Sequence, residues 1–193
     1  MTTLVAWVSY KNKKPTTLTF ASDSRLSWGK NDPKWNYGRK IYWCKNSPDL
    51  FGYSGDVVTQ STIISHVCDL LDYSAIKASN ATGEEKHQMF VALIQTAVAA
   101  QAGLKIGKLS TFHGQRMTEG DGPAFRLWHT EYDPQTNFWC DEELRFECND
   151  DIKNKHDAPG DAFASGTGTN KFWNNWREKQ KSQGKTHQWS SAL

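Results

Sequence analysis

MTTLVAWVSY (residues 1–10) decides the fold, because a strand begins in it almost at once. From Thr3 onward the stretch is rich in β-branched and aromatic residues, which favour strands. KNKKP (11–15) is polar and contains a proline, as is typical of a turn. TTLTFAS (16–22) has the composition of a second strand, so the sequence predicts a β-hairpin at the start of the chain.

Two more strands are predicted before residue 55. KIYWC (40–44) and LFGYS (50–54) are short and apolar, and Asn46-Ser47-Pro48-Asp49 between them reads as a turn. Four short strands joined by tight turns favour antiparallel pairing.

The hydrophobic period then changes to that of helices. Apolar residues recur at spacings of three and four over residues 57–71 and again over residues 84–102, and Gly103 stops the second run. Because these two amphipathic helices adjoin in sequence, we expect them to pack together as one layer.

The second half of the chain is predicted to return to strands after a Gly- and Lys-rich loop. We expect a hairpin of residues 125–132 and 136–140, an exposed charged loop at 148–161, a strand at 162–165 and a helix from about residue 170. Strands, then helices, then strands, then a helix indicate one α+β domain over residues 1–193, with helices covering antiparallel sheets.

Length and charge exclude several classes of protein. The chain has 193 residues, and 23 Lys and Arg against 21 Asp and Glu give a net charge of +2, so we expect no nucleic-acid partner. Aromatic residues make up 12% of the chain and include nine Trp, which favours a packed core over disorder. No apolar stretch approaches the ~20 residues of a membrane span, so no membrane partner is expected.

The spacing of cysteines and histidines gives no sign of a metal site. There is no C-x-x-C pair and no H-E-x-x-H motif, so we expect neither a metal nor a cofactor. Scattered cysteines without a signal peptide predict buried thiols in a reducing, cytoplasmic compartment. The cysteines are Cys44, Cys68, Cys140 and Cys148.

Thr2 is the first candidate for chemistry. A Met followed by a small residue is usually trimmed, which would give Thr2 a free α-amine beside its own hydroxyl. An α-amine with a pKa of about 7.7–8.0 can act as a general base near neutral pH. The simpler interpretation is a strand that starts early.

Asp23 and Lys40 could support such a nucleophile. Asp23 lies in ASDSR at the end of the second strand, which a hairpin would bring beside the start of the first. Lys40 opens the KIYWC strand, and a lysine near Thr2 would lower the pKa of the threonine hydroxyl. Taken alone, Asp23 is more simply interpreted as a turn residue, and Lys40 as an exposed lysine at the end of a strand.

Two glycine-containing turns lead from a strand into a helix. In GYSGD (52–56), Gly55 stands at a helix entrance, where a backbone N–H could stabilise an oxyanion. In SGTGT (165–169), Thr167 could hydrogen-bond to the amine of Thr2. An ordinary helix cap and an ordinary glycine-rich turn are the alternatives.

Taken together, these motifs resemble the proteasome β-subunit family of N-terminal nucleophile (Ntn) hydrolases, in particular the bacterial HslV and Anbu types. The matching features are TTLVA behind Met1, FASDSR at 20–25, Lys40 before an apolar strand, GYSGD and SGTGT, in the family's order and near its spacing. The resemblance implies a four-layer αββα sandwich. The family continues beyond the last helix through another helix and further strands, so we expect the chain to be truncated at its C-terminus relative to the family.

The resemblance also implies roles for the candidate residues. Thr2, freed by removal of Met1, would be the nucleophile and its amine the base. Asp23 and Lys40 would be the supporting pair, the Gly55 N–H would lie in the oxyanion hole, and Thr167 would stand where the family has a serine near the amine.

The implied activity is that of a threonine-type peptidase without a cofactor. It would act on polypeptide substrates inside a homo-oligomeric ring, with a separate ATP-dependent unfoldase as a possible partner. Two alternatives stay open: a non-catalytic structural subunit with the same fold, and an Ntn hydrolase for a non-peptide amide.

Overall fold

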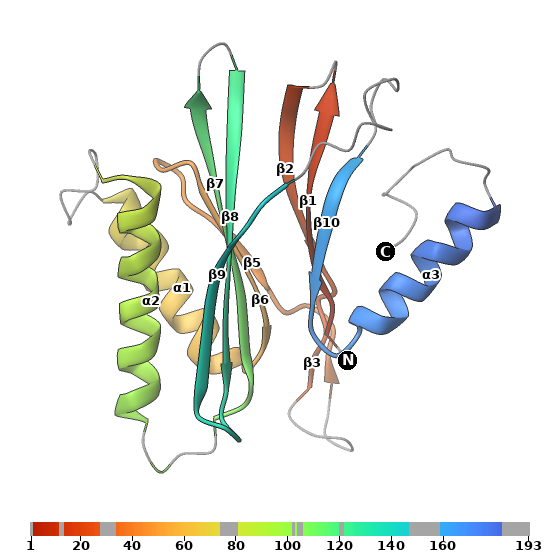
Figure 1. Ribbon diagram of the computed structural model, residues 1–193. Helices are drawn as coiled ribbons and strands as arrows, with labels where there is room; N and C mark the ends of the chain where they lie inside the picture. The colour runs from red at the N-terminus through yellow and green to blue at the C-terminus, as the bar shows by residue number, and fades with distance from the viewer. Residues whose placement is uncertain are drawn as a thin grey trace.

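The fold is seen in a computed structural model, which describes residues 2–11, 14–27, 34–73, 81–101, 103, 106–119, 122–146 and 159–182. Within these ranges the chain forms two main antiparallel sheets, a small two-stranded ribbon and three helices (Figure 1). The ribbon joins β3 (Leu26–Ser27) to β4 (Lys34–Trp35).

The smaller main sheet has the order β10-β1-β2. Its strands are β1 (Leu4–Lys11), β2 (Lys14–Ser22) and β10 (Pro159–Ser165). The predicted hairpin is confirmed, since β1 pairs antiparallel with β2. Leu4 stands opposite both Ser22 and Ser165, so the start of β1 lies between the ends of the other two strands.

The larger sheet has five antiparallel strands in the order β5-β6-β7-β8-β9. They are β5 (Ile41–Trp43), β6 (Asp49–Gly55), β7 (Leu109–Glu119), β8 (Gly122–Asp133) and β9 (Phe138–Leu144). The strands predicted at residues 40–44 and 50–54 and the hairpin of 125–132 with 136–140 are confirmed, with small changes of their bounds.

The prediction of a loop after Gly103 is wrong over much of that stretch, because residues 109–119 form β7 at the centre of the large sheet. Several polar side chains of this strand are buried and bonded to partners instead of exposed. The carboxylate of Asp49, for example, accepts from His113 Nε2 at 3.0 Å and from Gln115 Nε2 at 3.1 Å. The expected loop at 148–161 lies mostly outside the described residues, and β10 begins within its last residues.

Helices α1 (Val57–Asp72) and α2 (Gly83–Ala100) cover the outer face of the large sheet and pack together, as predicted (Figure 1). Asp56 caps α1 by accepting from Thr59 N, and Thr82 forms a reciprocal capping box with Glu85 at the start of α2. Their apolar stripes meet the sheet in a core whose fully buried members include Phe51, Ile64, Phe90 and Ile94.

The small sheet packs against the other face of the large one. Leu4, Ala6 and Phe20 from the small sheet share a second core with Phe112 and Leu127 from the large sheet. This inter-sheet core positions the site described below, because it holds the start of β1 against the end of β6.

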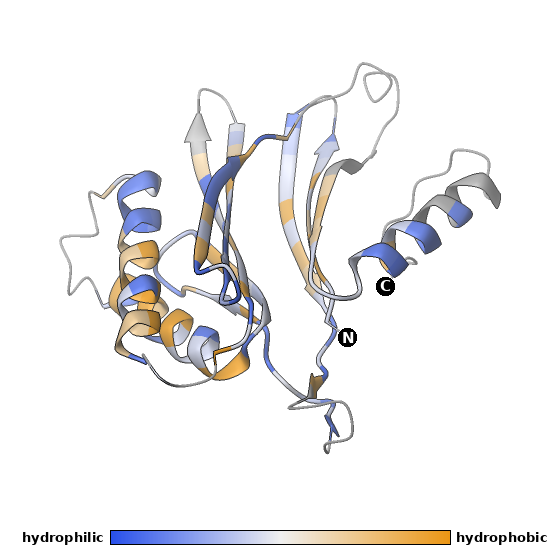
Figure 2. Ribbon diagram, turned by 60° about the horizontal axis from the view of Figure 1, so that its bottom comes forward, coloured by the Kyte–Doolittle hydropathy of each residue, from blue (hydrophilic) through white to orange (hydrophobic). Residues whose placement is uncertain are grey.

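Helix α3 (Thr169–Ser182) lies on the far side of the small sheet (Figure 1). The residues of α3 that are coloured in Figure 2 are mostly hydrophilic. Phe172 is the buried anchor of the helix, at 6% exposure. The chain is thus a mixed α/β protein with antiparallel sheets, and the full four-layer sandwich stays a prediction.

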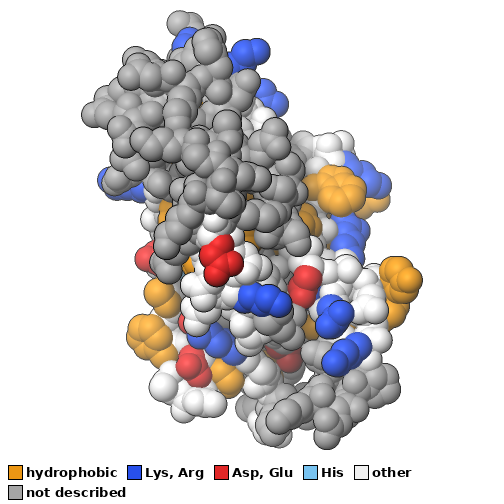
Figure 3. Space-filling view, turned by 90° about the vertical axis from the view of Figure 1, so that its right-hand side faces the viewer, with side chains coloured by type: hydrophobic (Ala, Val, Ile, Leu, Met, Phe, Trp, Pro, Cys, Tyr) orange, Lys and Arg blue, Asp and Glu red, His pale blue; other side chains and the backbone are white. Residues whose placement is uncertain are grey.

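The surface on the side of α3 carries acidic and basic side chains interspersed with polar ones (Figure 3), in keeping with the small net charge. None of the described helices is long and apolar enough to cross a bilayer. In the same ranges, no group of three or more His, Cys, Asp or Glu could hold a metal ion. Cys44 and Cys68 are buried, Cys140 is half-buried, and Cys148 lies outside the described residues.

Candidate active site

Thr2 is held by the turn between β10 and α3. Its backbone N–H donates to Thr167 Oγ1 at 2.9 Å, and its carbonyl accepts from Gly168 N at 2.9 Å. Gly166 makes this approach possible, because it adopts a φ of 101° and a Cβ there would lie 2.4 Å from the carbonyl oxygen of Thr2. The structure therefore brings Thr2 and Thr167 together. Met1 lies outside the described residues.

Asp23 and Lys40 lie beside the Thr2 side chain. Asp23 follows β2 directly, and its N–H donates to the carbonyl of Thr3 at 3.2 Å. Lys40 Nζ lies 2.7 Å from Asp23 Oδ1, 2.5 Å from the carbonyl oxygen of Arg25 and 3.5 Å from Thr2 Oγ1. The Lys40 side chain is only 2% exposed, so its ammonium is fixed by these oxygens with little access to water.

Gly55 ends β6 just before α1. Its φ is 102°, and a Cβ would lie 1.9 Å from the carbonyl oxygen of Lys108. The same carbonyl accepts from Asp56 N at 2.9 Å, which fixes the peptide that follows Gly55. Only glycine fits this position without a backbone shift.

The Gly55 N–H faces the side on which Lys40 reaches Thr2. Tyr53 N donates to the carbonyl of Lys40 at 3.1 Å, and the direction of N–H groups alternates along a strand. Gly55 follows Tyr53 by two residues, so its N–H points to the same edge of β6, the edge that pairs with β5. This pairing reaches only to Gly52, and Gly55 lies beyond it.

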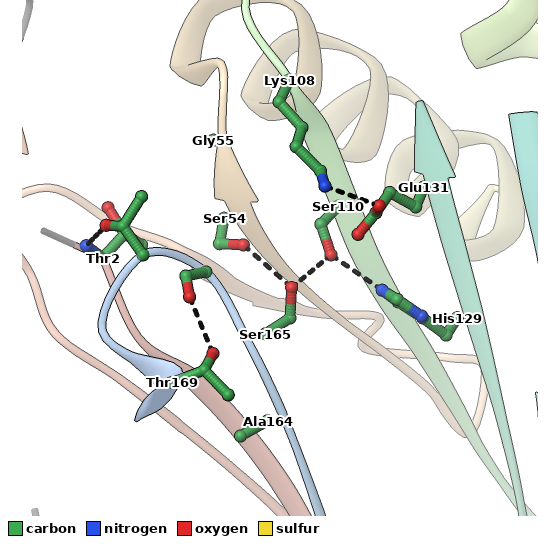
Figure 4. Close-up of a pocket in the computed structure, with 12 residues that line it drawn as sticks. Thr2, Ser54, Gly55, Lys108, Ser110, His129, Glu131, Ala164, Ser165 and Thr169 are labelled. Atoms are coloured by element: carbon green, nitrogen blue, oxygen red, sulfur yellow. Dashed lines mark hydrogen bonds and ion pairs between the residues drawn. The ribbon is translucent and has the colours of Figure 1, made fainter. Parts of the chain in front are cut away.

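A pocket of about 450 Å³ opens next to Thr2, between the two sheets (Figure 4). Gly55 and Thr167 line it together with Thr2, whereas Asp23 and Lys40 are not among its lining residues. Its other lining residues are Ser54, Lys108, Ser110, His129, Glu131, Ala164, Ser165, Gly166 and Thr169.

A chain of hydroxyl groups crosses this pocket and ends on an imidazole (Figure 4). Ser165 Oγ lies 3.3 Å from Ser54 Oγ and 2.5 Å from Ser110 Oγ, and Ser110 Oγ lies 2.8 Å from His129 Nε2. Sequence reasoning missed Ser110 and His129, because they lie on two different strands and carry no local motif. Ser54 belongs to GYSGD, but nothing in that motif showed that its hydroxyl faces Ser165. Ser165 belongs to SGTGT, but nothing in that motif showed that it faces Ser110.

The rim of the pocket carries an ion pair. Lys108 Nζ lies 2.7 Å from Glu131 Oε1, and this hydrogen bond raises the pKa of Lys108 above its usual value. Both side chains are partly exposed, so the pair contributes little to stability, but it places one charge of each sign at the entrance.

Gly166→Ala should loosen Thr2. The alanine would stand at a positive φ with its Cβ against the Thr2 carbonyl, which costs about 1–3 kcal/mol of unfolding free energy. Chemical denaturation measures the loss. The matched control is Gly122→Ala, since no atom lies within 4 Å of a Cβ at Gly122. Equal stability of the two variants would show that the turn does not constrain Thr2.

Comparison with known proteins supports the proteasome-like fold. No protein-family model matches the chain, and no curated protein matches it significantly. Among solved structures, it is similar to Anbu (ancestral beta-subunit) from Yersinia bercovieri, with a TM-score of 0.56 and 15% identity over 93% of this chain and 65% of that one. Anbu from Hyphomicrobium sp. strain MC1 aligns with a TM-score of 0.46 and 15% identity over 86% of this chain and 60% of that one. The chain therefore spans less than two thirds of the length of either protein. At this identity the likeness to the Yersinia protein establishes a shared fold.

Proposed function

We propose that the chain is a threonine-type amide hydrolase of the proteasome-like Ntn class, with Thr2 as nucleophile after removal of Met1. The observation that carries the proposal is the position of Lys40 Nζ, 3.5 Å from Thr2 Oγ1 and anchored by Asp23. A fixed cation beside a hydroxyl stabilises the alkoxide that forms when the hydroxyl loses its proton.

The remaining groups supply the other steps of an acyl transfer. The Thr2 amine takes the proton from its own Oγ1, directly or through a water, and Oγ1 attacks the substrate carbonyl. The Gly55 N–H stabilises the oxyanion, and the leaving amine takes a proton as the ester on Thr2 forms. Water, activated by the same amine, then releases the acid. Thr167 Oγ1, 2.9 Å from Thr2 N, orients that amine.

The finer parts of the proposal concern substrate and assembly. We infer a polypeptide substrate, a cytoplasmic location and a four-layer αββα sandwich. A peptidase free in the cytoplasm needs its site enclosed, so a homo-oligomeric ring, with a separate unfoldase chain to feed it, fits this activity. Light scattering of the purified protein tests the ring, and a monomer at all concentrations would exclude it.

The decisive experiment is a pair of covalent probes read out by intact mass. A peptide epoxyketone bonds to both the hydroxyl and the free amine of an N-terminal threonine, whereas a peptide vinyl sulfone needs the hydroxyl alone. Loss of the Met1 mass and one adduct from each probe on Thr2 are expected, and Thr2→Ala should gain neither.

The other outcomes favour the alternatives. Retained Met1 with no adduct would favour a non-catalytic subunit. Adducts on Thr2 without hydrolysis of any peptide, but with hydrolysis of simple amides, would favour an Ntn hydrolase for a non-peptide amide. A free Thr2 amine with neither adduct nor hydrolysis would contradict the enzymatic proposal.

A further inference from the structure

Ser110 and His129 form a hydrogen-bonded pair in the pocket that the proposed threonine chemistry does not use. Ser110 is the second residue of β7 and His129 lies opposite Phe112 in β8, so the large sheet itself holds the two side chains. The 2.8 Å between Ser110 Oγ and His129 Nε2 is within the range for proton transfer from a nucleophile to its base.

The surroundings of His129 favour the base form of its Nε2. Glu142 Oε1 lies 3.7 Å from Nδ1, too long for a hydrogen bond but close enough to favour a proton on that nitrogen. Nε2 then accepts from the Ser110 hydroxyl. Burial lowers the pKa of His129, and this effect outweighs the carboxylates of Glu131, Glu142 and Asp141, which act to raise it. The ring is therefore neutral near pH 7.

Among the three serines of the pocket, Ser110 is the one whose hydroxyl has a neighbouring base. With its proton directed to His129, Ser110 Oγ accepts from Ser165, and Ser165 accepts from Ser54. All three serines line the same pocket, yet Ser110 is the serine among them that contacts an imidazole.

The pocket has the size and the polar groups that an acyl donor needs. Its volume of about 450 Å³ falls within the range of small-molecule sites. Lys108, Gly55 and Gly166 are among its lining residues, and a lysine ammonium and glycine N–H groups are of the kind that stabilise an oxyanion.

We propose that Ser110 is a second nucleophile, with His129 as its general base, and that this pair hydrolyses small uncharged esters independently of Thr2. Ser110 Oγ forms a bond to the ester carbonyl while its proton moves to His129 Nε2. The C–O bond to the alcohol breaks, and the alcohol leaves with that proton. Water then attacks the acyl-serine, gives a proton to Nε2, and releases the acid as Ser110 recovers its hydrogen.

The test uses a short-chain alkyl fluorophosphonate on the Thr2→Ala protein, in which the threonine hydroxyl is absent. Ser110 Oγ should displace fluoride and form one phosphonyl adduct, located by peptide mass mapping. Ser110→Ala should abolish it, and His129→Gln should slow it by about 100-fold or more, since the base is lost. Hydrolysis of p-nitrophenyl acetate should fall in parallel.

The matched control is Ser61→Ala on α1, whose hydroxyl bonds to the carbonyl of Val58 outside the pocket and whose loss should leave labelling unchanged. Thermal unfolding confirms that each variant is folded. If His129→Gln does not fold, the residue that carries the adduct in the Thr2→Ala protein still tests the proposal. No adduct, an adduct on Ser54 or Ser165, or labelling unaffected in folded His129→Gln would overturn the proposal. Because Thr2 is absent throughout, none of these outcomes bears on the proposed threonine chemistry.

Discussion

Replacing Lys40 with methionine should slow acylation of Thr2 by about two to three orders of magnitude, the size expected when one fixed group is removed from a developing anion. Methionine keeps most of the length of the side chain and fills a site that is 2% exposed. It removes the cation 3.5 Å from Thr2 Oγ1 and leaves Asp23 without its partner at 2.7 Å. The rate of vinyl sulfone addition to Thr2 measures how strongly its hydroxyl is activated, on which acylation also depends.

The control for this prediction is Lys45→Met. Lys45 is exposed and lies two residues after the end of β5. It removes the same charge from the surface and should leave the rate within about twofold, because exposed charges are screened. Asp23→Asn should reproduce part of the Lys40 effect, since the amide still accepts a hydrogen bond but no longer attracts the ammonium. If Lys40→Met is folded and labels at the wild-type rate, the lysine has no part in activating Thr2.

The parts of the fold that could be predicted are those with a regular hydrophobic period. The hairpin of β1 and β2 and the helices α1 and α2 bury one face against apolar neighbours, and their sequences show it. Strand β7 could not be predicted in this way, because Ser110, Thr111, His113 and Gln115 are all buried. Apart from Gln115 Oε1, their side-chain polar atoms bond to residues of other elements, and such contacts leave no trace in the local sequence.

The parts of the candidate site that could be predicted are those that follow from hairpin geometry and from the order of the motifs. Pairing of β1 with β2 places Asp23 beside the start of β1, and the structure brings Lys40 and Thr167 to Thr2 as well. The contact of Ser110 with Ser165 depends instead on how the two sheets face each other. No periodicity within either strand encodes that relation, so the polar pocket beside Thr2 emerged only from the structure.

Replacing Asp49 with alanine should lower the free energy of unfolding by about 3–5 kcal/mol, as expected when one partner of a buried ion pair is removed. The Asp49 side chain is fully buried. One of its oxygens accepts from His113 and Gln115, and the other contacts Ser47 and, at 3.2 Å, Lys86 Nζ. The variant leaves Lys86 as a buried cation and takes a hydrogen-bond partner from His113, so a domain of ordinary stability would be close to unfolding.

The pH dependence of this loss follows from the pKa of Asp49. Burial alone would raise that pKa, but the hydrogen bond and charge of His113, together with Ser47 and Lys86, hold it below the ordinary value. A carboxyl with a lowered pKa in the folded state adds stability above its unfolded pKa of about 3.9 and loses it as pH falls through the folded value. Urea denaturation should therefore show the full difference between wild type and Asp49→Ala at pH 7, and a smaller one only below about pH 4.

Asp69→Ala is the control, because Asp69 is exposed on α1 and its loss should change stability by no more than about 0.5 kcal/mol. Equal stability of the two variants at pH 7 would mean that the buried carboxylate adds no net stability to the contact between α2 and the large sheet.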